Sequence, residues 1–207
     1  MSFAPLAGLV LAGGQSKRMG RDKAVLRVAG ESLLDRAVRL LSKELADVRV
    51  AVRADQAAEQ TRSRHHLIID CFADSGPAAG ILAAHQADTA SAWLVVACDM
   101  PRLDAGAIAG LIAARDPQAD ATAWASPADG KPEPLCAIYE PGTLAAFLAS
   151  VQAGGNTSPR SWLQTVRLRL LDAPDPSVLE SANTPDELAR LQDHMRPSTD
   201  GADQDEV

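Results

Sequence analysis

The sequence predicts an α/β protein of one domain, with three layers (α/β/α) and a mainly parallel sheet in the middle. Short apolar runs alternate along the chain with stretches whose apolar residues recur at helical spacing, the pattern of strands connected by helices. The run AWLVVACD at 92–99 is apolar almost throughout, as expected for a strand covered by helices on both faces. A chain of 207 residues, 46% of them hydrophobic, is long enough for one such domain, which we expect to span 1–195.

The elements before residue 92 follow from their apolar patterns. LAGLVLA at 6–12 is a short aliphatic run that ends at glycines, which predicts a buried strand. ESLLDRAVRLLSKEL at 31–45 carries leucines at helical spacing with charges between them, which predicts an amphipathic helix. VRVAVRA at 48–54 and HLIID at 66–70 predict two further strands. GPAAGILAAHQA at 76–87 is rich in small residues and predicts a helix that lies close against the sheet.

The elements after residue 99 are less regular. We expect helices at 104–115, 141–154 and 158–165 and strands at 121–126, 134–140 and 166–173. The segment NTPDELARLQDHM at 183–195 has a helix-start signature, with Thr184 as N-cap, Pro185 at the first helical position and Glu187 three residues after the cap. Residues 196–207 carry four acids and have little to bury, so we expect a disordered acidic tail.

Composition and charge narrow the class of protein. A net charge of −7 argues against nucleic-acid binding, which favours a basic face. No leader pattern opens the sequence and no run approaches the roughly 18 apolar residues of a membrane span, so we expect a cytoplasmic protein with no membrane contact. Three widely spaced cysteines show no metal-binding spacing and are expected to be buried reduced thiols: Cys71, Cys98 and Cys136.

The segment after the first predicted strand is the first candidate site, because ligands of parallel sheets bind beyond the carboxyl ends of the strands. LAGGQSKRMGRDK at 11–23 places Gly13 and Gly14 where the backbone can turn tightly and approach a ligand. Backbone N–H groups and four cations then suit a polyphosphate: Lys17, Arg18, Arg21 and Lys23. The segment is neither a P-loop nor GxGxxG, and its spacing also fits a solvated basic loop.

Two aspartates end later strands. Asp70 closes HLIID and Asp99 closes AWLVVACD, where a carboxylate can hold a metal ion or cap the next helix or turn. Mg²⁺ is held by one or two carboxylates plus substrate phosphates, so Asp99 and the cationic loop form a consistent pair. Phosphoryl and nucleotidyl transfer needs no protein nucleophile, and none is evident. The four histidines are interpreted as structural or exposed: His65, His66, His85 and His194.

With these residues in view, the chain resembles the molybdenum cofactor guanylyltransferases, within the nucleotide-diphospho-sugar transferase (Rossmann-like) type of nucleotidyltransferase. LAGGQSKRMGRDK meets every fixed position of the family opening LAGG-x-S-x-RMG-x-DK. GPAAGI, ACDMP and NTPDEL correspond to the family's GPLAGI, PCDMP and NTPEEL, in the same order. The resemblance extends from residue 6 to about residue 192, and it implies the same fold.

The resemblance also implies a set of functional residues. The implied nucleotide-binding residues are Leu11, Ala12, Gly13, Gly14, Lys23, Asp70, Asp99 and Asn183. The implied catalytic residues are Arg18, Lys23 and Asp99, and Asp99 is also the implied Mg²⁺ ligand. Three positions depart from the family: Ala78 replaces the usual leucine, and Ser181 stands where some members have asparagine. The asparagine that some members place after the second strand is missing, with Ala51 and Arg53 nearby.

The implied reaction transfers GMP from GTP to the terminal phosphate of molybdenum-molybdopterin, releasing pyrophosphate, with Mg²⁺ as cofactor. We expect a monomer with transient contacts to a molybdenum-inserting partner and to client molybdoenzymes. One alternative is cytidylyl transfer from CTP, whose enzymes tend to have LAAG, whereas Gly13 leaves room for a purine. Two others are a sugar-1-phosphate nucleotidyltransferase and a non-catalytic nucleotide- or pterin-binding regulator, in which Asp99 would be dispensable.

Overall fold

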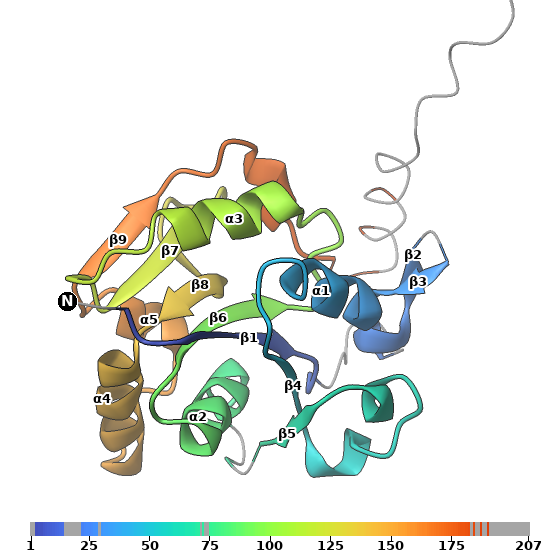
Figure 1. Ribbon diagram of the computed structural model, residues 1–207, viewed down its shortest axis with the longest axis horizontal. Helices are drawn as coiled ribbons and strands as arrows, with labels where there is room; N and C mark the ends of the chain where they lie inside the picture. The colour runs from blue at the N-terminus through green and yellow to red at the C-terminus, as the bar shows by residue number, and fades with distance from the viewer. Residues whose placement is uncertain are drawn as a thin grey trace, which may run out of the picture.

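The computed structural model describes residues 3–14, 22–28, 30–70, 72, 75–182, 184, 187 and 190. It confirms the predicted three-layer α/β fold: a central twisted sheet has α1 and α3 on one face and α2 and α4 on the other (Figure 1). The predicted acidic tail at 196–207 lies outside the described residues. No helix in the described part of the chain is both long enough and apolar enough to cross a membrane.

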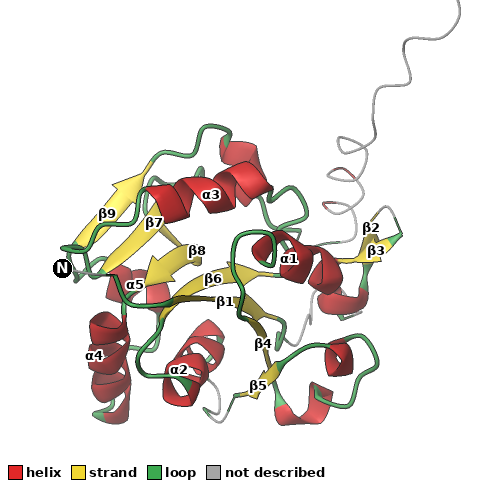
Figure 2. Ribbon diagram, viewed as in Figure 1, coloured by secondary structure: helices red, strands yellow, loops and turns green. Residues whose placement is uncertain are grey.

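The main sheet has seven strands within the described residues, in the order β5-β4-β1-β6-β8-β7-β9 (Figure 2). The first four are parallel to one another, β8 is antiparallel to both of its neighbours, and β9 is parallel to β7. The strands are β1 (Leu6–Leu11), β4 (Val48–Val52), β5 (Leu67–Ile69), β6 (Ala92–Ala97), β7 (Ala121–Ala125), β8 (Pro132–Tyr139) and β9 (Leu168–Leu171). The sheet is therefore mainly parallel on the side that holds β1 and β6.

Apolar residues of the helices pack against both faces of the sheet. The helices are α1 (Leu33–Leu41), α2 (Pro77–Ala87), α3 (Ala105–Ala113), α4 (Pro141–Gln152) and α5 (Pro159–Leu163). Apolar residues of α1 and α3 pack with alternate residues of β1 and β6 in one core cluster, and those of α2, α4 and α5 pack with the other alternate residues in a second. All six residues of β6 are buried, which confirms the prediction from its apolar run.

The structure corrects the bounds of one predicted helix and confirms the start of another. The helix predicted at 31–45 is shorter, because the Ser32 hydroxyl accepts a hydrogen bond from the backbone N–H of Asp35 (3.0 Å) and so starts the helix at Leu33. Glu31 and Ser32 instead form β3, which pairs with β2 (Arg27–Val28) in a small hairpin that the apolar pattern did not predict. The helix-start signature is confirmed by reciprocal bonds between Thr184 and Glu187 (3.1 and 3.2 Å), while Pro185 lies outside the described residues.

Candidate active site

A cavity of about 680 Å³ lies at the carboxyl ends of β1, β4, β5 and β6, beside the start of α2. Its wall includes seven of the residues expected to bind a nucleotide: Leu11, Ala12, Gly13, Gly14, Lys23, Asp70 and Asp99. Asn183, the eighth residue expected to bind the nucleotide, and Arg18, which is expected to be catalytic, lie outside the described residues. The structure thus brings together, at the predicted edge of the sheet, every expected residue that it describes.

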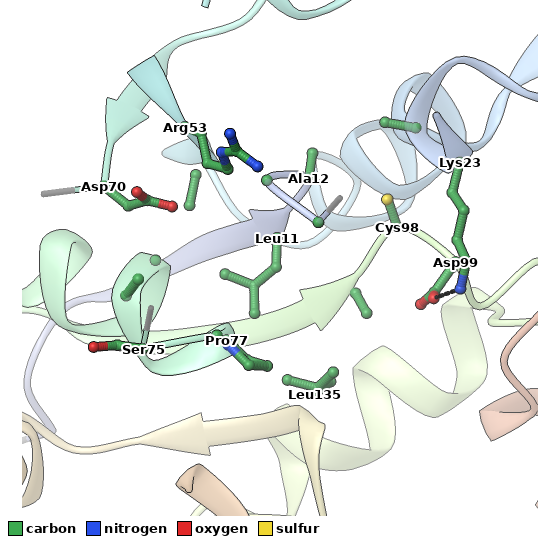
Figure 3. A pocket seen from close by; sticks show the side chains of 18 of the residues that line it. Leu11, Ala12, Lys23, Arg53, Asp70, Ser75, Pro77, Cys98, Asp99 and Leu135 are labelled. Carbon is green, nitrogen blue, oxygen red and sulfur yellow. Dashed lines mark hydrogen bonds and ion pairs between the residues drawn. The ribbon is translucent and has the colours of Figure 1, made fainter. Parts of the chain in front are cut away.

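Lys23 and Asp99 meet at one end of the cavity. Lys23 Nζ lies 2.7 Å from Asp99 Oδ2, and the two side chains are 15% and 20% exposed (Figure 3). Lys23 begins the short 3₁₀ helix η1 (Lys23–Val25), and Asp99 follows β6. The backbone N–H of Ala182 donates to the Asp99 carbonyl (2.9 Å), so the segment that leads into the C-terminal motif lies beside Asp99. The expected convergence of the cationic segment on Asp99 is confirmed for Lys23.

Asp70 and Arg53 occupy the other end of the cavity, with Leu11 and Ala12 between the two ends (Figure 3). Burial raises the pKa of Asp70, and the positive charge of Arg53 partly opposes that rise. Arg53 Nη2 donates to Asp55 Oδ2 (2.7 Å), which holds the guanidinium in place. A Cβ added to Gly13 would lie 3.4 Å from both Arg53 N and Asp70 Oδ2, in contact with this wall. Because Gly13 has no side chain, the space between its backbone and the pair Asp70 and Arg53 stays open to a ligand.

The start of α2 forms the cavity floor between the two ends. Gly76 caps the helix with a φ of +54°, a left-handed conformation that favours glycine. Gly80 faces Leu11 and Ala51 across the helix–sheet contact. Ala78, which replaces a family leucine, is fully buried in a cluster with Leu82 and Phe147. The substitution therefore changes packing behind the helix and leaves the cavity wall unaltered.

Two charged residues near the site were not predicted from the sequence. Arg62 is fully buried behind the wall and binds the Ala12 carbonyl (2.7 Å). Glu133 lies near enough to Asp99 for their negative charges to interact, because the pairing of β8 with β6 brings the start of β8 to the end of β6. Burial raises the pKa of Glu133, and the negative charge of Asp99 adds to that rise. No apolar periodicity marks either residue, because both depend on pairings between distant segments.

Glu133 is engaged by a nearby arginine. Arg160 Nη2 donates to Glu133 Oε2 (3.2 Å), and its Nη1 lies 3.3 Å from Asp129 Oδ2. Trp162, on the same helix, stacks on Phe147 and donates to the Thr143 hydroxyl (3.0 Å). Trp162 is thus part of the packing between α4 and α5.

The described cysteines and histidines lie away from the cavity, except Cys98. Cys98 lines the cavity, but burial raises the pKa of its thiol to about 12, so it stays neutral. Cys136 is fully buried, and Cys71 lies outside the described residues. Of the described histidines, His65 bonds Asp35 (2.9 Å), His85 is buried and His66 is exposed; none of these three lines the cavity. His194 lies outside the described residues.

The donor set fits a magnesium–phosphate complex better than an all-protein metal site. Among the described residues no group of three or more His, Cys, Asp or Glu side chains could hold a metal ion. Mg²⁺ needs only one or two carboxylates when substrate phosphates supply other ligands. Asp99 lines the cavity and is partly exposed, so its carboxylate can supply the one protein ligand that such a complex needs, although Lys23 Nζ now pairs with it at 2.7 Å.

The fold and the cavity are those of a nucleotidyltransferase-type domain. Comparison of the sequence with known protein families agrees. Residues 8–172 match the MobA-like NTP transferase domain, so the chain belongs to that family. Among similar proteins, one from Opitutus terrae, named probable molybdenum cofactor guanylyltransferase, is 40% identical over 167 residues, covering 79% of this chain and 81% of that protein. A molybdenum cofactor biosynthesis bifunctional protein from Synechocystis is 30% identical over 92% of this chain, and the match spans 55% of that protein's length.

Solved structures show the same fold. A molybdopterin-guanine dinucleotide biosynthesis protein A from Archaeoglobus fulgidus superposes with a TM-score of 0.75 at 23% identity. The superposition covers 91% of this chain and 98% of the other.

Proposed function

We propose that this protein is a Mg²⁺-dependent guanylyltransferase, which transfers GMP from GTP to the terminal phosphate of molybdenum-molybdopterin. The names of the relatives support the reaction class. The observation that carries the proposal is the Lys23–Asp99 pair (2.7 Å) at one end of a cavity whose other end holds Asp70 and Arg53. A cation and a metal-binding carboxylate suit the triphosphate, and the opposite end suits the base.

The proposed reaction is an in-line displacement at the α-phosphorus. An oxygen of the acceptor's terminal phosphate forms a bond to the α-phosphorus of GTP, the bond from that phosphorus to the α–β bridging oxygen breaks, and pyrophosphate leaves with the bonding electrons. Lys23 donates to phosphate oxygens and neutralises charge on the α-phosphate and the leaving group, with Arg18 as a second cation implied by the resemblance. Mg²⁺, held by Asp99, would supply further charge neutralisation on the phosphates.

The end of the cavity that holds Asp70 and Arg53, the base end, suits guanine. Guanine offers two donors, N1–H and the N2 amino group, which a carboxylate such as Asp70 can accept side by side. It also offers two acceptors, O6 and N7, which an arginine guanidinium binds in a bidentate manner. Within the described residues, Arg53 bonds Asp55 through Nη2, which leaves its other N–H groups to serve a base. These two side chains, with the slim backbone at Gly13, support GTP over CTP as the substrate.

Further features are proposed with this function. The catalytic domain spans 1–195, and Asn183 completes the nucleotide site. The protein acts in the cytoplasm as a monomer and makes transient contacts with a molybdenum-inserting partner and client molybdoenzymes. The role of Asn183 and the partners rest on the family resemblance of the sequence motifs, the location on the absence of a leader pattern, and the domain bounds on the acidic composition of 196–207.

The test is pyrophosphate release by the full-length protein from GTP or CTP, with and without molybdopterin and Mg²⁺. We expect pyrophosphate release only when GTP, Mg²⁺ and the pterin are all present. In Asp99→Asn the rate of release should fall by about 10²-fold or more. Asp129→Asn is the matched control, because Asp129 pairs with Arg160 and is not among the cavity-lining residues; it should retain activity. Release from CTP would reassign the donor, and Mg²⁺-independent GTP binding without release would indicate a regulator.

A further inference from the structure

The guanidinium of Arg62 joins the two segments that flank residues 13–21. Arg62 Nη2 and Nε both donate to the Ala12 carbonyl, at 2.7 and 3.3 Å. Nη2 and Nη1 also contact the two carboxylate oxygens of Asp22, at 2.9 and 2.7 Å. Nη1 further lies 3.4 Å from Glu59 Oε2. One fully buried side chain therefore holds the residue at the end of β1 and the residue just before Lys23.

The contacts of Arg62 lead directly to the Lys23–Asp99 pair. Asp22 Oδ1 accepts a hydrogen bond from the backbone N–H of Ala24 (3.1 Å) and so caps η1, the short helix that begins with Lys23. On the other side, the Ala12 N–H donates to the Ala51 carbonyl (3.0 Å), which ties Ala12 to β4. Ala12, Asp22 and Lys23 all line the cavity, so a shift of Arg62 would move its wall.

A charge at this buried position is costly unless it is paired and hydrogen-bonded. Burial alone would lower the pKa of Arg62, but the hydrogen bond and charge of Asp22, with Glu59, raise it above its usual value. The pairing with Asp22 and Glu59 therefore keeps the Arg62 guanidinium charged and in place between Ala12 and Asp22.

We propose that Arg62 is a positioning residue that holds Ala12 and Asp22, the residues on either side of 13–21, so that Lys23 is placed opposite Asp99 before the nucleotide binds. The proposal rests on the function proposed above. Lysine cannot replace Arg62, because a single ammonium group cannot contact the Ala12 carbonyl and both Asp22 oxygens together, as the planar guanidinium does. Arg62 acts through Ala12 and Asp22 and does not line the cavity itself.

The first experiment measures kcat and KM for GTP in Arg62→Lys and Arg62→Met, at a temperature where circular dichroism shows each variant folded. We expect kcat/KM to fall by up to about 10²-fold, with both a lower kcat and a higher KM, because the phosphate-binding groups are displaced. Combining Arg62→Met with Lys23→Met should lower kcat/KM less than the product of the two single effects, since Arg62 acts largely through Lys23. A purely structural role would leave both constants unchanged in the folded fraction.

The matched control is Arg115→Lys. Arg115 is also an almost buried arginine (7% exposed) that binds a carboxylate with two bonds, to Glu140 at 2.6 and 2.8 Å, but it is not among the cavity-lining residues. Its replacement should lower the melting temperature and leave kcat and KM unchanged. If the Arg62 variants do not fold, Asp22→Asn removes the charge partner instead and should show the same kinetic loss.

Wild-type kcat and KM in folded Arg62→Lys and Arg62→Met, or in Asp22→Asn when those two fail to fold, would overturn the proposal. The wild-type protein is assayed first with GTP, CTP and ATP, which separates this failure from that of the proposed function. If the wild type uses a triphosphate other than GTP, the variants are compared on that substrate, and the same loss supports the role of Arg62. If the wild type binds no nucleoside triphosphate, both proposals are wrong.

Discussion

Gly80 of α2 packs so closely on Leu11 of β1 that a Cβ at Gly80 would lie 2.7 Å from Leu11 Cδ2. The same Cβ would lie 2.8 Å from the Cβ of Ala51, which belongs to β4. The Leu11 side chain can turn aside, but the Cβ of Ala51 is fixed to the backbone of β4, so the helix itself must move away from the sheet. All three residues line the cavity, so Gly80 sets the spacing between its floor and the sheet.

Gly80→Ala should therefore destabilise the protein, although alanine is the better helix former. We expect a loss of about 1–3 kcal/mol in the free energy of unfolding from overpacking, measured by urea denaturation. Gly142→Ala is the matched control, because Gly142 also lies in a helix but has no neighbour within 4 Å of the added Cβ. It should be neutral or stabilising by up to about 1 kcal/mol. Equal effects of the two substitutions would show that α2 adjusts freely.

Lys23→Met tests the ion pair with Asp99, at the end of the cavity proposed to hold the triphosphate. The substitution leaves the Asp99 carboxylate without the cation that now lies 2.7 Å away, so Asp99 should bind Mg²⁺ more tightly in the absence of nucleotide. Turnover at saturating GTP should nevertheless fall by about 10²-fold, since Lys23 is proposed to neutralise charge that develops in the reaction. Metal binding is measured by calorimetry and turnover by pyrophosphate release.

Lys131→Met is the control for Lys23→Met, because Lys131 is exposed and is not among the cavity-lining residues. It should change neither metal affinity nor turnover. An unchanged Mg²⁺ affinity in Lys23→Met would mean that Asp99 is not the metal ligand, and unchanged turnover would remove Lys23 from the mechanism.

The parallel side of the fold could be predicted from the sequence because burial on both faces makes a strand uniformly apolar, as in β6. Once the strands are parallel, their carboxyl ends meet at one edge, which is why Lys23, Asp70 and Asp99 could be grouped before the structure was known. The boundary of α1 was wrong because apolar spacing extends past both ends, whereas the Ser32 cap decides where the helix starts.

Residues whose roles depend on long-range pairing could not be predicted. Glu133 comes to Asp99 only through the antiparallel pairing of β8 with β6, and strand direction leaves no trace in apolar periodicity. Arg62 lies in a polar stretch after β4, and nothing in that stretch indicates that its side chain is fully buried. The close approach of α2 to the sheet could be predicted from its small residues, but the particular contact of Gly80 with Leu11 and Ala51 could not.

Asp70→Asn tests how the base end reads the nucleotide. An asparagine can present its amide N–H where the carboxylate presented an acceptor, and xanthine has a carbonyl at C2 where guanine has an amino group. If Asp70 accepts from N1–H and the N2 amino group, the variant should lose about 10-fold or more in kcat/KM for GTP and gain relative activity with XTP. Activity is measured by pyrophosphate release with each triphosphate.

ITP, which lacks the N2 amino group, is the internal control for Asp70→Asn. The wild type should prefer GTP over ITP, and the variant should lose that preference. Equal losses with GTP, ITP and XTP would place Asp70 away from the base edge, for example at the ribose.

His85 should make the stability of the fold depend on pH. It is buried in α2, and its Nδ1 makes no hydrogen bond within the part of the chain that the structure describes. Burial lowers the pKa of His85 below its usual 6.5, against the opposing charge of Asp88. The unfolded chain then binds the extra proton first, so the free energy of unfolding should fall as pH drops below about 6.5, by at most about 1.4 kcal/mol per pH unit.

His85→Leu should remove this part of the pH dependence, because leucine fills a similar buried space without a titrating group. Urea denaturation between pH 5 and 8 measures the effect, with exposed His66→Gln as the matched control that should retain the wild-type slope. Because the folded-state pKa is lowered, the contribution of His85 is fully present above the unfolded pKa and is lost on acidification. A variant with the same slope as the wild type would show that folding does not lower the pKa of His85.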